Sequence, residues 1–214
     1  MDWVLLLSRV TICVTIASNF GGMPVFMDII RKGSTHSVPF LPFLAGFVSN
    51  TGGICYAMMR ADSVLLTVSG VGITMSTIYV SLFLFFSSEV GKTSRQLMIS
   101  GGAIFSFYFY LTGFVREPSS VEAQLGLVVG VLITGMNLAP IASVGDMLKR
   151  QSSEGLSFSI ATAIFVTSCL WVLYGIAVDD LVLTLPSLSG VFSGLVQYYM
   201  LWFYPSKAKR VKAE

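Results

Sequence analysis

The chain has 214 residues, of which 54% are hydrophobic and 11% are charged, and its formal net charge is +2. Soluble domains contain roughly a quarter charged residues, so this composition excludes an ordinary soluble domain and indicates a membrane protein. The basic C-terminal tail is suited to anionic lipid, and no nucleic-acid partner is expected.

Apolar residues fall into runs of about the 17 to 25 residues that a helix needs to cross a bilayer. Backbone groups cannot stay unpaired in lipid, and the runs lack the alternation of β-barrel strands, so each run is predicted to be a helix. The sequence therefore predicts an all-α membrane protein. In chain order, the predicted spans are residues 4–27, 39–59, 63–86, 97–115, 125–147, 156–178 and 181–204.

Lysine and arginine residues gather on one side of these spans. One side holds Arg31, Lys32, Lys92, Arg95, Lys149, Arg150, Lys207, Lys209, Arg210 and Lys212. The opposite side holds only Arg60 and Arg116, and Arg9 lies inside the first run. Because cytoplasmic loops carry the positive excess, the N-terminus is predicted to be extracellular or luminal and the C-terminus cytoplasmic.

An internal repeat relates the first three spans to the last three. At a constant offset of 118 positions, the identical pairs are Asp28 and Asp146, Ser34 and Ser152, Phe40 and Phe158, Tyr56 and Tyr174, Asp62 and Asp180, Ser69 and Ser187, and Gly72 and Gly190. Pro24 and Pro140 correspond at an offset of 116. The chain therefore contains two copies of one three-helix unit.

The fourth span explains how both copies take the same orientation. Three crossings invert the chain, so one further helix is needed before the second copy can run parallel to the first. The predicted organisation is a first repeat at 1–88, a linker helix at 89–118, a second repeat at 119–206 and a basic cytoplasmic tail at 207–214. Parallel repeats of this kind occur in secondary transporters. A seven-span receptor or membrane scaffold is the alternative.

Both copies carry a recognisable pattern of motifs. In the first repeat the pattern is Pro24, Ser34-Thr35, Phe40-Leu41-Pro42-Phe43, Tyr56, Asp62 and Ser69 to Gly72. In the second it is Ala139-Pro140, Lys149 to Glu154, Trp171 to Gly175, Asp180 and Pro186 to Gly190. This pattern resembles the SWEET (MtN3/saliva) sugar transporters over nearly the whole chain. The resemblance implies a facilitative carrier of mono- or disaccharides that works by alternating access.

The resemblance also implies the substrate site. SWEET proteins typically hold sugar with one asparagine in the third span and one in the seventh, and this chain has Ser69 and Ser187 at those positions. Serine is shorter than asparagine and forms fewer hydrogen bonds. A larger pocket, or a sugar different from that of other family members, is therefore a further interpretation. Trp171 is predicted to stack on a sugar ring, although tryptophan also anchors membrane interfaces. At the position equivalent to Trp171, the first repeat has Gly53.

Two buried amides, those of Asn50 and Asn137, are further candidates for substrate contacts, because an unpaired amide in lipid is costly. Joining neighbouring helices is their alternative role.

An extracellular gate is predicted from four residues at the outer ends of spans two, three, six and seven. They are Tyr56, Asp62, Tyr174 and Asp180. A phenol-to-carboxylate hydrogen bond between the repeats would close that side.

Pro24, Pro42 and Pro140 are predicted hinges, since proline removes a backbone donor and bends a helix. The proline expected in the sixth span is absent, and Ser157 or Ser159 stands there.

The predicted mechanism is uniport without proton coupling. Away from the span ends the only charged side chain is that of Arg9, which does not release a proton near neutral pH. No catalytic group, metal site or cofactor is predicted, so the chain is not expected to be an enzyme. Besides a receptor or scaffold, the second alternative is a carrier of a different small polar solute, such as an amino acid. The plasma membrane is the expected location, with the Golgi or endosomal membrane as alternatives, and homo-oligomerisation stays open.

Overall fold

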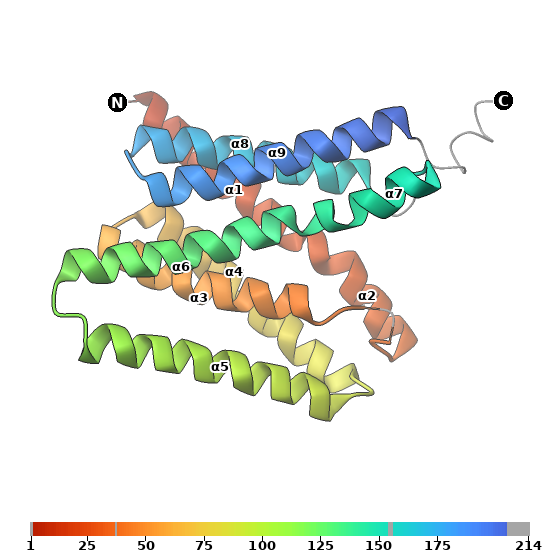
Figure 1. The fold of residues 1–214 in the computed structure, drawn as a ribbon, viewed down its shortest axis with the longest axis horizontal. Coiled ribbons are helices and arrows are strands. Elements are labelled where there is room, and N and C mark those ends of the chain that lie inside the picture. Colours follow the sequence, from red (N-terminus) through yellow and green to blue (C-terminus); the bar gives the residue numbers. More distant parts are fainter. Residues whose placement is uncertain (1, 37, 154–155, 205–214) are drawn as a thin grey trace. The chain divides into compact units, whose positions relative to one another are not determined.

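The computed structural model describes residues 2–36, 38–153 and 156–204, and every regular element in these ranges is a helix. Figure 1 shows the elements along the chain. They are α1 (Asp2–Asn19), η1 (Phe20–Gly22), α2 (Met23–Lys32), α3 (Leu41–Arg60), α4 (Ser63–Phe86), α5 (Val90–Gly113), α6 (Pro118–Leu138), η2 (Ala139–Ser143), α7 (Val144–Arg150), α8 (Phe158–Ala177) and α9 (Leu181–Phe203).

Helices occupy all the predicted spans, but several begin or end outside the apolar runs. α5 starts at Val90 rather than at residue 97, and α2 continues to Lys32 rather than ending at residue 27. The extra turns contain charged residues such as Lys92 and Arg95. A hydropathy pattern marks where the side chains are apolar, whereas a helix continues for as long as its backbone hydrogen bonds do.

By length and hydropathy, the described residues contain five segments that could cross a bilayer, which are Trp3–Lys32, Ser63–Phe86, Pro118–Arg150, Phe158–Ala177 and Leu181–Phe203. α3 and α5 are the two other helices of comparable length. Glycine, serine and asparagine dilute the apolar character of α3, and Lys92 and Arg95 do so at the start of α5.

The first and fifth predicted spans are each interrupted by a short 3₁₀ segment. η1 separates α1 from α2, and Pro24 occupies the first turn of α2. In the second repeat, Pro140 lies within η2, which separates α6 from α7. A proline lacks the N–H that a continuing α-helix would use, so the ladder changes locally to tighter 3₁₀ bonding.

Residues 15–129 form one compact unit. Its core is aromatic and lies where α2, α3 and α4 meet. Phe26 stacks on Tyr79 with ring centroids 4.1 Å apart, and Phe43 meets Phe26 edge-on at 4.7 Å. The Tyr79 hydroxyl also donates a hydrogen bond to the Asn19 carbonyl at 3.2 Å. This bond supports the backbone at the point where the first span is interrupted.

The second compact unit contains the chain up to Val14 and from Gly130 onward. Its most extensive packing is between α8 and α9, which lie side by side (Figure 1). Glycines bring these helices together, since a Cβ built on Gly194 would lie 2.8 Å from the Phe165 Cβ. Gln197 is buried and donates to the Ser193 carbonyl at 3.4 Å. A small residue, as expected for membrane helices, therefore allows α8 and α9 to approach closely.

Candidate functional site

Ser69 and Ser187 are both buried, and they lie at the same register of α4 and α9. The Ser187 hydroxyl donates to the Leu183 carbonyl of its own helix at 2.6 Å. Ser69 packs against the opposing helix, because a Cβ on Gly53 would lie 2.6 Å from the Ser69 Oγ. With its proton engaged, the Ser187 hydroxyl offers a ligand only its acceptor lone pairs.

Trp171 is partly buried on α8 and braced by a neighbouring aromatic ring. Its ring meets that of Tyr174 edge-on, with centroids 5.7 Å apart and an interplanar angle of 86°. This T-shaped contact restrains the indole. The equivalent position in the other repeat, Gly53, has no side chain and is occupied by the Ser69 contact. The two repeats therefore differ most in side-chain volume at this position.

Asn50 joins α3 to α4. Its amide donates to the Gly46 carbonyl at 2.7 Å and to the Ser76 hydroxyl at 3.4 Å, and its oxygen lies against Gly72. Asn50 thus has the helix-joining contacts that its residue type suggested as an alternative to substrate binding.

Asn137 joins α6 to α9. It donates to the Pro186 carbonyl at 3.1 Å and to the Ser189 hydroxyl at 3.4 Å. Both partners are on α9, next to Ser187. Asn137 therefore also has contacts that join two helices, and its role in binding substrate stays a prediction.

The aspartates of the predicted gate have an additional role as helix N-caps. Asp62 accepts hydrogen bonds from the backbone N–H groups of Val64 and Leu65 at 2.8 and 2.9 Å. Asp180 does the same at the start of α9, where the N–H groups of Val182 and Leu183 donate at 2.8 and 3.3 Å. Sequence analysis missed this role. An aspartate placed directly before an apolar run is the signal that could have identified it.

We expect Asp180→Ala to lower the free energy of unfolding by about 1 kcal/mol, because two N–H groups lose their acceptor. Asp180→Asn keeps an oxygen at the same place and should unfold close to wild type. The measurement is the melting temperature in detergent, with Asp62→Ala as the repeat-matched comparison. Equal melting temperatures for the alanine and asparagine variants would contradict the cap assignment.

Tyr56 and Tyr174 are both buried, on α3 and α8 respectively. Each lies about one turn from the C-terminal end of its helix, close in sequence to the capping aspartate that follows. Their pairing with an aspartate of the other repeat stays a prediction.

The three predicted hinge prolines occupy different local positions. Pro24 and Pro140 lie at the 3₁₀ interruptions of the first and fifth spans. Pro42 lies in the first turn of α3, where a missing N–H deletes no intrahelical bond. Pro186 is inside α9 and buried, and sequence analysis did not consider it as a hinge. A proline within an apolar run is a signal that could have identified it.

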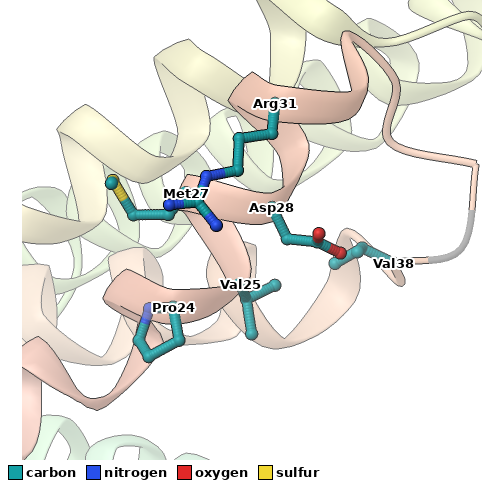
Figure 2. A pocket seen from close by; sticks show the side chains of 6 residues that line it. All are labelled: Pro24, Val25, Met27, Asp28, Arg31 and Val38. Carbon is teal, nitrogen blue, oxygen red and sulfur yellow. The ribbon is translucent and has the colours of Figure 1, made fainter.

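An open pocket of about 620 Å³ lies beside the first interruption and is lined by Pro24, Val25, Met27, Asp28, Arg31 and Val38. Figure 2 shows the Asp28 carboxylate pointing toward Val38. Asp28 also forms an exposed ion pair with Lys32 at 2.6 Å. The pocket is therefore amphipathic, with carboxylate and guanidinium groups beside apolar side chains.

Comparisons with known proteins identify the family. Residues 5–90 and 123–209 match the MtN3_slv family model, described as "Sugar efflux transporter for intercellular exchange". These two segments cover more than half of the chain. The chain belongs to the SWEET (MtN3/saliva) family. It is therefore a multi-pass membrane protein of a transporter family rather than an enzyme, as predicted.

Similar SWEET proteins align along nearly the full chain. "Sugar transporter SWEET1" of Xenopus tropicalis is 31% identical, with 96% of both chains covered. "Sugar transporter SWEET1" of Homo sapiens is 28% identical, over 83% of this chain and 80% of that protein. A solved structure of a eukaryotic SWEET transporter matches with a TM-score of 0.84 and 21% identity, covering 94% of this chain and 96% of the other. The predicted 3+1+3 fold is confirmed.

Proposed function

We propose that this chain carries sugars across a membrane as a facilitative uniporter. The observation that carries the proposal is the near full-length similarity to sugar transporters of the SWEET1 type, together with the match of both repeats to a sugar efflux family model. The proposed cycle is alternating access of the two repeats, 1–88 and 119–206, around a sugar. The N-terminus lies on the outer side, and the basic loops lie on the cytoplasmic side.

The proposed sugar contacts divide into stacking and hydrogen bonding. Trp171 covers the apolar face of the sugar ring, held in place by its edge-on contact with Tyr174. Ser187 accepts a hydrogen bond from a sugar hydroxyl, since its own proton goes to the Leu183 carbonyl. Ser69, Asn50 and Asn137 complete the proposed polar lining. Serines are shorter than the asparagines typical of the family and leave more room for the sugar.

Proton coupling is not part of the proposal. A proton-driven carrier usually places a titratable group within the bilayer, whose protonation changes during the cycle. The two aspartates that precede α4 and α9, the helices of Ser69 and Ser187, accept backbone hydrogen bonds at the N-termini of these helices. Sugar is therefore proposed to move down its own gradient.

The test is uptake of radiolabelled glucose and of sucrose into proteoliposomes, with protein-free liposomes as the control. Uptake of at least one sugar should saturate with concentration, exchange with unlabelled sugar inside the vesicle, and be indifferent to a proton uncoupler. Strong inhibition by the uncoupler would reject uniport. Stronger competition by an amino acid than by any sugar would instead indicate a different polar cargo.

A further inference from the structure

An ion pair connects the end of α3 to the beginning of α6. The Arg60 guanidinium lies 3.2 Å from the Glu122 carboxylate, and the two side chains are 35% and 33% exposed. The residues are 62 positions apart in sequence. Arg60 also lies on the side of the membrane that is predicted to carry few basic residues. The positive-inside rule therefore does not explain its position.

The two helices also approach closely one turn or more away from the ion pair. A Cβ built on Gly52 would lie 2.7 Å from the Val129 side chain. Gly52 precedes Arg60 by eight residues, and Val129 follows Glu122 by seven, which correspond to about 12 and 10 Å along a helix. The near-equal spans mean that α3 and α6 run antiparallel and approach each other at two points about two turns apart, one of which is the ion pair.

The contact joins different repeats, since α3 belongs to the first and α6 to the second. Moving Arg60 by the offset of 118 gives Val178, and moving Glu122 by the offset of 116, which relates Pro24 to Pro140, gives Leu6. Only one of the two symmetry-related positions can therefore form an ion pair. The duplicated fold does not require these charges, and their occurrence as a matched pair in contact needs a separate explanation.

We propose that Arg60 and Glu122 are positioning residues that hold the outer ends of the two repeats together and separate when the carrier opens outward. This inference rests on the proposed function, from which the alternating cycle and the outer side are taken. The attraction between the Arg60 and Glu122 side chains is weak enough for a contact that breaks and forms again. Ion pairs with exposure of this order shift an equilibrium by about fivefold or less, and each charge can return to water when the helices part.

The test measures the outer separation of the repeats directly. Spin labels are attached at Ser63→Cys and Ser119→Cys, two exposed positions at the starts of α4 and α6. Cys13, Cys55 and Cys169 are first replaced by alanine, and sugar uptake is checked in that background. Double electron–electron resonance then gives the distance distribution of the protein in liposomes.

Arg60→Glu places two negative charges together and should reduce the short-distance population about fivefold relative to the long-distance one. The double exchange Arg60→Glu with Glu122→Arg should restore the wild-type distribution. Arg116→Glu makes the same charge change at an exposed position on the same side and should leave the distances unchanged. An unaltered distribution in Arg60→Glu, or no recovery in the double exchange, would overturn the proposal.

Salt offers a second test that needs no substitution. Raising the ionic strength to about 1 M shortens the screening length to about 3 Å, and it should move the wild-type distribution in the direction of Arg60→Glu. An unchanged distance distribution at high salt would also contradict the proposed role of the Arg60–Glu122 ion pair. If the distances respond as expected while wild-type protein transports no sugar, the proposed function fails and the ion pair stands. If wild-type protein transports sugar normally while the distances do not respond, the proposed function stands and the ion-pair proposal fails.

Discussion

Gly175→Ala is expected to lower the free energy of unfolding by about 3 kcal/mol, the upper end of the usual cost of overpacking a core. A Cβ at this position would meet the Thr184 hydroxyl, lie 2.9 Å from the Thr184 backbone nitrogen and lie 3.1 Å from the Asp180 carbonyl oxygen. Two of these three atoms belong to the backbone and cannot rotate away.

The neighbouring hydrogen bonds explain why the effect should be large. The Asp180 N–H donates to the Gly175 carbonyl at 2.8 Å, and the Thr184 hydroxyl donates to the Asp180 carbonyl at 2.8 Å. A methyl group at residue 175 would push α8 away from the first turn of α9, where these bonds and the Asp180 cap are concentrated.

The measurement is the melting temperature of purified protein in detergent, and about 3 kcal/mol corresponds to a loss of about 6 to 12 °C. Gly135→Ala is the matched control, because Gly135 has nothing within 4 Å of the added Cβ. That control should be neutral or slightly stabilising, since alanine is a better helix former than glycine. If both variants melt together, the close approach of α8 and α9 at Gly175 is wrong.

Trp171→Ala is expected to raise the KM for sugar uptake about tenfold or more. Removing an aromatic ring costs the stacking contact, and about 1.4 kcal/mol is a factor of ten in affinity. The variant also removes the partner of the Tyr174 ring. The melting temperature measured beside uptake separates loss of substrate contact from loss of packing.

Trp171→Phe and Trp202→Ala are the comparison variants. Phenylalanine keeps a stacking face but has no N–H donor, so it should recover part of the affinity. Trp202 is 82% exposed near the end of α9, and its removal should leave KM unchanged. A wild-type KM in Trp171→Ala would reject the sugar-facing role and leave only the packing role of this residue.

The internal repeat identified pairs of residues that have equivalent contacts in the structure. It paired Asp62 with Asp180, and both carboxylates cap the helices that follow them. It also paired Gly72 with Gly190, and both glycines receive a polar side chain from the neighbouring helix, Asn50 and Ser168 respectively. These contacts are short in sequence or repeated in both copies, so a pattern read along the chain could indicate where they occur.

Other contacts had no such signal. Hydropathy located the first span but did not reveal the 3₁₀ break at Phe20–Gly22, because 3₁₀ and α-helical bonding accept the same side chains. The serine pair was recognisable at the family's pocket positions, yet nothing in the sequence indicates that the Ser187 proton goes to Leu183. The roles of these residues in transport stay predictions.

The sequence by itself determined the class of protein, the helical spans, the duplication and the family. These follow from local requirements, since a chain in lipid must satisfy its backbone within each apolar helix. Only the tertiary structure decided which polar groups meet, such as Arg60 with Glu122 or Asn137 with the Pro186 carbonyl. The rotation and depth of each helix set these pairings, and both depend on the packing of all its neighbours rather than on its own residues.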